Sequence, residues 1–202
     1  MTTGLEVAGL ALAIFPLLVN QLDNYARGIE KIRLLARWRR SLAEYALDIG
    51  TQHVIFQNTL EQVLDGVVDD TYDATELSND PQSDLWSDSK VQTKLKRKLG
   101  RNYEVFIGNM TGAYSILFEL SKRLGIDLTQ ADLASDLACK DIKPWKVLST
   151  AVYTDLSQKL SNANGTLKIL IEQPPNIATE YHTGEAAFCR VFANRVNMPK
   201  SS

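Results

Sequence analysis

The chain has 202 residues, of which 45% are hydrophobic and 23% charged, and its formal net charge is −2. This size and composition exclude a low-complexity or strongly charged chain and are typical of a folded protein with one sizeable core. The near-neutral charge gives no global electrostatic reason to bind nucleic acid. Cys139 and Cys189 lie far apart without a metal-binding spacing, so we expect reduced thiols in a cytosolic protein.

The first predicted helix spans Gly4 to Val19 and is apolar on every side, with Glu6 as its one charge. Such a helix must be enclosed by protein or by lipid. Its uncharged run, Val7 to Val19, has 13 residues, whereas a membrane span needs about 20. We expect Thr3 and Glu6 to form a capping box, and Pro16 to kink or end the helix. A buried central helix is favoured over a membrane-active one.

A basic stretch follows this helix, and only Glu30 opposes its charge locally. Two interpretations remain open. The stretch is either a patch for anionic lipid headgroups or phosphate, or a solvated helix face whose acidic partners come from elsewhere. The solvated face is slightly favoured. The candidate headgroup-binding residues are Arg33, Arg37, Arg39 and Arg40.

A second long helix is predicted up to about Gly66, because apolar residues recur from Leu42 at three- and four-residue steps. We expect His53 to be a structural histidine beside this apolar stripe. From Glu61 to Asp88 the sequence is acidic, with no Lys or Arg, and is rich in turn formers. It lacks the calcium-loop pattern and predicts a solvated, flexible connection.

A basic helix is predicted next, starting near Ser89, with a narrow apolar stripe of Val91, Leu95 and Leu99. Its cations either neutralise the acidic loop or form a second patch for lipid or nucleic acid. No aromatic residues alternate with them, which disfavours a single-strand stacking platform. The cations are Lys90, Lys94, Lys96, Arg97, Lys98 and Arg101.

A third long helix is predicted from Asn102 to Leu124 and a fourth from Pro144 to Pro174, with a short helix at Gln130 to Ala138 between them. In the third helix, Gly108 and Gly112 have the small-xxx-small spacing, which predicts close packing inside the bundle. No strand signal is present in the sequence. The sequence therefore predicts an all-α, four-helix-bundle-like domain around the apolar N-terminal helix.

No sequence motif for a phosphate cradle, a metal centre or a nucleophile is found. We therefore expect a protein that is not an enzyme and has no catalytic residue, cofactor or metal. An enzyme whose site is assembled from distant residues is a third and weaker hypothesis.

Three stretches of the sequence resemble segments of a known protein family. They read GLEVAGLALAIFPLLVNQLDNY, WRRSLAEYALDIGTQHVIFQNTLEQVL and LWSDSKVQTKLKRKLGRNYEVFIGNM. The first resembles the opening of a large group of fungal proteins, and the others resemble that group's next helices. There this region precedes a kinase-like domain, which is absent from this sequence. The region is likened to HeLo and HeLo-like domains, fungal cell-death modules similar in shape to the executioner domain of the mixed-lineage kinase-like pseudokinase.

This resemblance implies a HeLo-like bundle at residues 1–173. The remaining residues, 174–202, lie outside the resemblance and are expected to form an irregular, partly disordered tail. The resemblance also implies a role in fungal regulated cell death or non-self recognition (heterokaryon incompatibility), at membranes and after oligomerisation. Expected partners are further copies of the chain or a regulatory protein, together with anionic lipids but not nucleic acid. The expected location is the cytoplasm, with movement to the plasma membrane. A cytosolic adaptor without membrane activity is the alternative. The membrane-insertion candidates are Leu5, Val7, Leu10, Leu12, Ile14, Phe15, Leu17 and Leu18.

Overall fold

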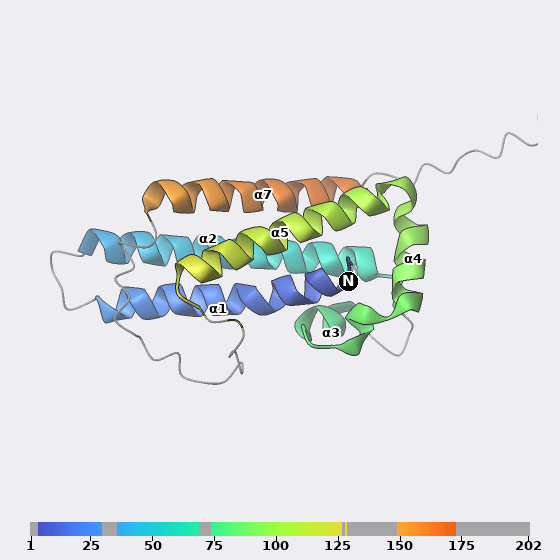
Figure 1. Cartoon of the computed structure of the whole chain (residues 1–202), viewed down its shortest axis with the longest axis horizontal. Coiled ribbons are helices and arrows are strands. Elements are labelled where there is room, and N and C mark those ends of the chain that lie inside the picture. Colours follow the sequence, from blue (N-terminus) through green and yellow to red (C-terminus); the bar gives the residue numbers. More distant parts are fainter. Residues whose placement is uncertain (1–3, 30–35, 69–73, 127, 129–148, 173–202) are drawn as a thin grey trace, which may run out of the picture.

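The computed structural model describes residues 4–29, 36–68, 74–126, 128 and 149–172. Within these ranges all regular elements are helices, and four long helices form a bundle (Figure 1). They are α1 (Glu6–Gly28), α2 (Ala36–Leu64), α5 (Tyr103–Arg123) and α7 (Thr150–Glu172). The prediction of an all-α bundle with a buried, apolar N-terminal helix is confirmed. The short helix expected at 130–138, the residues around Pro144 and the tail lie outside the described residues.

α1 packs against α2 and α5, and α7 packs against the same two helices (Figure 1). Fully buried phenylalanines from α1, α2 and α5 contribute to the shared core, namely Phe15, Phe56 and Phe106. Each of them belongs to an apolar series with three- and four-residue spacing, which places one face of its helix in the core. The core therefore joins segments that lie far apart in the sequence.

α1 is longer than predicted and runs without interruption through Pro16. Beyond Val19 it continues because Leu22, Tyr25 and Ala26 keep a buried face through a stretch that is otherwise polar. Pro16 lies on the exposed side of the helix, and the helix persists because its other face is held by tertiary packing. The expectation that Pro16 could end the helix is therefore wrong.

The described start of α1 leaves the predicted capping box of Thr3 and Glu6 untested. Leu5 is the N-cap residue and makes no side-chain capping bond, and Glu6 is the first helical residue. Thr3 lies outside the described residues.

The acidic segment is folded over residues 74–88, where a flexible connection was expected. Residues 74–88, here named the cap, contain α3 (Ala74–Asn79) and the 3₁₀ helix η2 (Asp84–Ser87). Leu77 and Trp86 are buried in the main core. These two apolar side chains anchor the cap to the bundle. Because most of their neighbours in the sequence are acidic or polar, the sequence pattern did not predict this packing.

The basic helix α4 (Ser89–Leu99) lies across one end of the bundle and leads through η3 (Gly100–Asn102) into α5 (Figure 1). The Asp88 carboxylate accepts a hydrogen bond from the Lys90 backbone N–H at 2.7 Å and so caps α4. Val91, Leu95 and Leu99 are buried, as predicted.

The two glycines of α5 do not mediate close packing within the bundle. A Cβ atom built at Gly108 or Gly112 would meet nothing within 4 Å, and both residues are exposed. The small-xxx-small spacing faces solvent because the core face of α5 is formed by Phe106, Met110 and Leu117. The prediction of a packing role for these glycines inside the bundle is wrong.

Candidate functional site

The apolar helix α1 and its N-cap residue Leu5 include all eight membrane-insertion candidates, and the bundle covers most of them. Six are buried: Leu5, Val7, Leu12, Ile14, Phe15 and Leu18. Leu17 is half-buried against the core, and Leu10 is 43% exposed. Leu10 departs from the predicted burial of this helix, because it belongs to the side of α1 that also exposes Pro16 and Asn20.

Aromatic packing holds the middle of α1 against α2. The Phe15 ring stacks on the His53 imidazole at a centroid distance of 4.9 Å and contacts the Phe56 ring at 5.5 Å. Burial lowers the pKa of His53 below its usual value, because the apolar surroundings disfavour the charged imidazolium. His53 is thus a packed structural histidine, as the sequence predicted.

α5 holds both ends of α1. Near the start, a Cβ atom at Gly4 would overlap the Ile107 side chain, so only glycine allows this approach. Near the other end, the Tyr25 hydroxyl donates to the Leu124 carbonyl oxygen at 2.7 Å, in a buried position. The two helices run in the same direction along the bundle (Figure 1).

The cap covers the first half of α1 at Gly9. A Cβ atom at this glycine would lie 2.8 Å from the Pro81 carbonyl oxygen and 2.9 Å from Trp86 Cδ1. The cap itself is internally braced, because Trp86 Nε1 donates to the Asp80 carbonyl oxygen at 2.9 Å. The absence of a side chain at Gly9 is what lets the cap pack directly on the helix backbone.

Side-chain hydrogen bonds from Ser78 and Asn79 join the cap to α2. The buried Ser78 hydroxyl donates to Glu61 Oε1 at 2.7 Å, and Gln57 Nε2 donates to Asn79 Oδ1 at 2.7 Å. α1 is therefore enclosed by α2, by α5 and by the cap.

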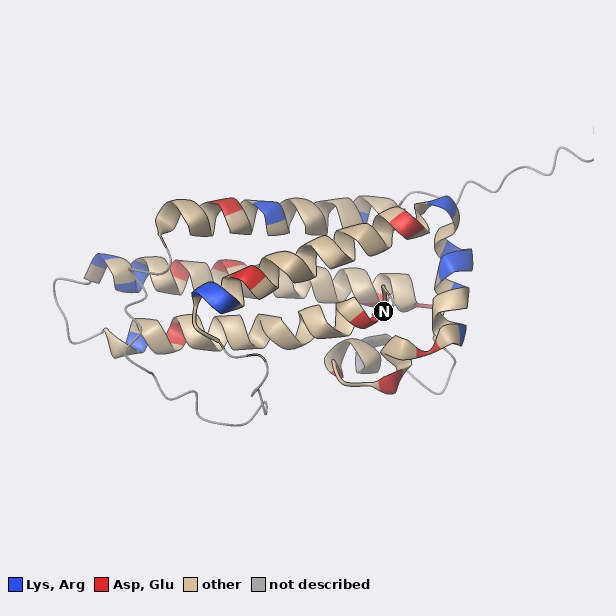
Figure 2. Ribbon diagram, viewed as in Figure 1, with Lys and Arg blue, Asp and Glu red and all other residues tan. Residues whose placement is uncertain are grey.

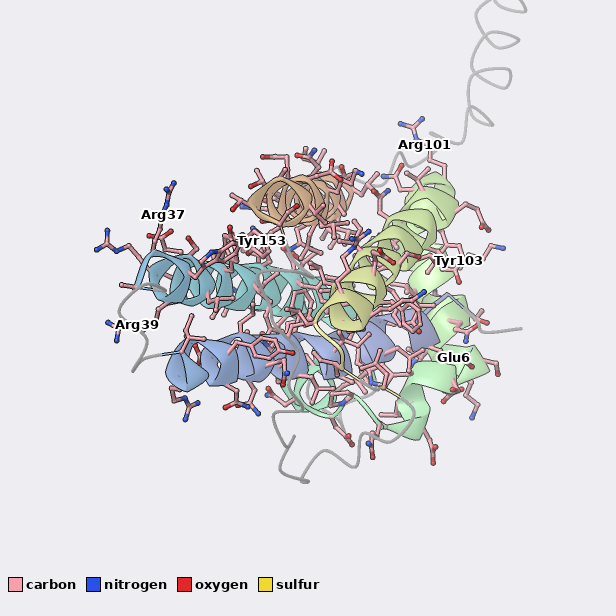
Figure 3. All side chains as sticks on the ribbon, turned by 60° about the vertical axis from the view of Figure 1, so that its left-hand side comes forward. Glu6, Arg37, Arg39, Arg101, Tyr103 and Tyr153 are labelled. Carbon is pink, nitrogen blue, oxygen red and sulfur yellow. The ribbon has the colours of Figure 1, made fainter. Side chains whose placement is uncertain are left out.

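The predicted headgroup residues lie at the end of the bundle remote from the start of α1. Arg37, Arg39 and Arg40 are exposed in the first turns of α2, and Arg33 lies outside the described residues. Figure 3 shows Arg37 and Arg39 at one end and Glu6, the first residue of α1, at the other. This separation follows from the length of α1, because the arginines come after the far end of a helix of 23 residues.

A second group of cations, on α4, lies at the same end as the start of α1 (Figure 2). Lys98 Nζ donates to the Asp65 carbonyl oxygen at 2.6 Å and to that of Gln62 at 3.2 Å. It therefore binds carbonyl groups at the C-terminal end of α2, where a cation is favoured by the helix dipole. Lys96 lies 3.9 Å from Glu104 and 5.6 Å above the Tyr103 ring.

A polar seam joins α2 to α7, and the sequence did not reveal it. Tyr45 and Tyr153 stack at 3.6 Å, and the Tyr153 hydroxyl donates to Asp48 Oδ2 at 2.9 Å. The Ser157 hydroxyl donates to the same carboxylate. Burial, reinforced by Asp48, raises the pKa of Tyr153 well above its usual value, so this tyrosine stays protonated.

The seam continues one turn further along α2 and two turns further along α7. The buried Asn164 amide donates to Oε1 of Gln52 at 2.8 Å and to its backbone carbonyl oxygen at 3.0 Å. These pairs fix the register of α7 on α2, since each polar group matches one position on the facing helix.

Among the described residues no group of three or more His, Cys, Asp or Glu side chains is placed to hold a metal ion. In the same residues α1 is the one helix long and apolar enough to cross a membrane, a test that a core helix also passes. Comparison with protein-family models, curated proteins and solved structures finds no match. The features that bear on function are thus the apolar helix α1, its packing against α2, α5 and the cap, and the cations at the two ends of the bundle.

Proposed function

We propose that this chain is a non-enzymatic, HeLo-like module of fungal regulated cell death or non-self recognition. In the resting state α1 is stored in the bundle. After release, it inserts into the plasma membrane from the cytoplasm, together with α1 of other copies. The observation that carries the proposal is the continuity of α1 over 23 residues, and the sequence resemblance supplies the biological setting.

The dimensions of α1 fit a bilayer better than the sequence suggested. At a rise of about 1.5 Å per residue its length is about 34 Å, against a hydrocarbon thickness of about 30 Å. Between Glu6 and Asp23 it carries no formal charge. In the bundle, 56% of its most apolar stretch is buried. The helix is therefore long enough to span and is only partly covered at rest.

Two backbone and charge features favour insertion as an oligomer. Pro16 has no N–H group, so the Leu12 carbonyl lacks its usual helical partner, which is costly in lipid. Glu6 would lie at the membrane surface or against another copy. Neighbouring helices can satisfy both groups, as can a regulatory protein partner.

Leu10 allows the proposal to be tested without opening the core. Because Leu10 is 43% exposed in the bundle, we expect Leu10→Asp to change the free energy of unfolding by no more than about 1 kcal/mol. In lipid the same carboxylate should cost about 1–3 kcal/mol. Dye leakage from anionic vesicles, and toxicity on expression in yeast, should fall at least about fivefold.

The matched control is Leu47→Asp, which adds the same charge to an α2 side chain that is 73% exposed. It should change neither stability nor leakage. Equal leakage from wild type and Leu10→Asp, or no leakage from the wild-type protein after acid or lipid treatment, would contradict membrane insertion of α1. Deleting residues 1–19 is a poorer test, because it removes Phe15 and Leu18 from the core.

The second candidate function is a cytosolic adaptor that binds a protein helix. The outer face of α5 favours it, because the open positions at Gly108 and Gly112 are flanked by Val105 and Phe118, which are 52% and 45% exposed. A Gly108→Leu/Gly112→Leu variant should lose a protein partner while keeping vesicle leakage. Loss of leakage without loss of a partner would argue against the adaptor.

A further inference from the structure

Three cations of α4 form a stripe on one side of the helix. Lys90, Lys94 and Arg97, here named the α4 stripe, recur at steps of four and three residues and so share a helix face. Lys90 and Arg97 are exposed and Lys94 is half-buried. The apolar series Val91, Leu95 and Leu99 is buried on another side. The stripe extends about 10 Å along the helix, and Arg101 follows it in η3.

The orientation of this stripe is fixed by contacts on the remaining sides of α4. Lys98 is hydrogen-bonded to the carbonyl end of α2, and Leu95 is fully buried beneath the helix. Lys96 lies beside Glu104 and Tyr103 at the start of α5. α4 cannot rotate without breaking these contacts, so the stripe is a preformed feature of the folded protein.

The stripe lies at the end of the bundle where α1 begins. Gly4 packs on Ile107 in the first turns of α5, and η3 connects α4 directly to that helix. Figure 3 shows Glu6, Tyr103 and Arg101 at this end. Val105, in the same turn of α5 as Tyr103, is 52% exposed. The stripe therefore lies at the end of the bundle where α1 begins, and the first turn of α5 at this end exposes Val105.

We propose that the α4 stripe is the docking surface for an anionic membrane, and that Arg37, Arg39 and Arg40 are not. A preformed row of cations suits the anionic headgroups of a bilayer surface. A single-stranded nucleic acid is disfavoured, because no aromatic residue alternates with these cations to stack the bases. Docking at this end would bring the start of α1 close to lipid. This inference rests on the proposed membrane function.

The experiment compares two triple variants that remove the same charge from opposite ends of the full-length protein. Lys90→Gln/Lys94→Gln/Arg97→Gln removes the stripe, and Arg37→Gln/Arg39→Gln/Arg40→Gln is the matched control. Gln retains good helix propensity, so both should melt near the wild-type temperature. Binding is measured by co-sedimentation with phosphatidylserine–phosphatidylcholine vesicles and with pure phosphatidylcholine vesicles.

The stripe variant should bind the anionic vesicles about 100-fold more weakly than wild type, since each cation near such a surface contributes about fivefold. The control variant should bind within about twofold of wild type. Wild-type binding should weaken as salt rises and be absent on the neutral vesicles. If the stripe variant has a lower melting temperature than wild type, the variant Lys90→Gln/Arg97→Gln replaces it. Its affinity for the anionic vesicles should be about 25-fold lower than that of wild type.

Several results would overturn the inference. They are an equal loss in both triple variants, a loss confined to the Arg37, Arg39 and Arg40 variant, or no wild-type binding to anionic vesicles. Stripe-dependent binding to a DNA duplex without vesicle binding would also overturn it. Failure of the proposed function is distinguishable, because it is measured by leakage with Leu10→Asp, whereas the docking surface is measured by sedimentation.

Discussion

At the scale of single residues, two glycines inside long helices have opposite surroundings. At Gly9 in α1 an added Cβ would lie 2.8 Å from the Pro81 carbonyl oxygen, which is backbone and cannot turn aside. At Gly50 in α2 an added Cβ would meet nothing within 4 Å. Helix propensity alone treats the two positions alike, so the difference between them measures how closely the cap packs on α1.

We therefore expect Gly9→Ala and Gly50→Ala to change stability in opposite directions. Gly9→Ala should lower the free energy of unfolding by about 1–3 kcal/mol through overpacking. Gly50→Ala should raise it by about 0.5–1 kcal/mol, because alanine loses less backbone entropy in a helix. Urea unfolding followed by circular dichroism gives both values. A stabilised Gly9→Ala protein would show that the cap does not rest on α1.

At the scale of secondary-structure elements, the sequence predicted helices best where an apolar series ends in a clear stop signal. The third predicted helix, Asn102 to Leu124, agrees with α5 to one residue at each end. Its stop is Gly125, which has a φ of 69°. The backbone N–H groups of Gly125 and Ile126 donate to Lys122 and Ser121 carbonyl oxygens, the pattern of a Schellman cap.

The elements that could not be predicted from the sequence are held in place by contacts with residues distant in sequence. The cap depends on Leu77 and Trp86 reaching the core of other helices, and two apolar residues among acids give no periodic signal. α1 beyond Val19 depends on Tyr25 reaching α5. The polar seam depends on matching Tyr153 to Asp48 across 105 positions, which no local pattern reveals.

The contact between α1 and α2 makes stability depend on pH through His53. Its pKa is lowered in the folded protein, so below about pH 6.5 the unfolded chain binds a proton that the folded chain does not. Stability contributed by neutral His53 is therefore complete above that pH and is lost as pH falls through the folded pKa.

We expect wild type to lose stability between about pH 7 and pH 5 by more than a His53→Gln variant does. Equilibrium unfolding in urea at several pH values checks this. Parallel pH profiles for the two proteins would mean that His53 does not titrate differently on folding. Because His53 stacks on Phe15, protonation of His53 should weaken the packing of α1 against α2.

At the scale of the whole molecule, the two outer helices of the bundle are held by different chemistry. α1 is held largely by apolar side chains, which stabilise roughly in proportion to the area they bury. α7 meets α2 through the polar seam, in which neither the Tyr45 hydroxyl nor Asn164 Oδ1 has a hydrogen-bond partner among the described residues. A hydrogen bond contributes only about 0.5–1.5 kcal/mol net.

We therefore expect α7 to open before α1 in native-state hydrogen exchange. Amides of α7 should exchange at least about tenfold faster than those of α1. Mass spectrometry of peptides covering Thr150–Glu172 and Glu6–Gly28 measures the difference. Asn164→Ala should widen it, because Gln52 then loses its partner. Earlier exchange of α1 would show that the apolar helix is the weaker attachment.

The order of elements along the chain has a consequence for synthesis on the ribosome. α1 is made first, but α5, which binds both of its ends, is complete only at Arg123, 95 residues after Gly28. At about 5–20 residues per second, translation of that interval takes about 5–20 s. During that time the nascent chain displays an apolar helix without its full enclosure. A chaperone that shields α1 during these seconds would decide whether the chain folds into a bundle or is captured by the nearest bilayer.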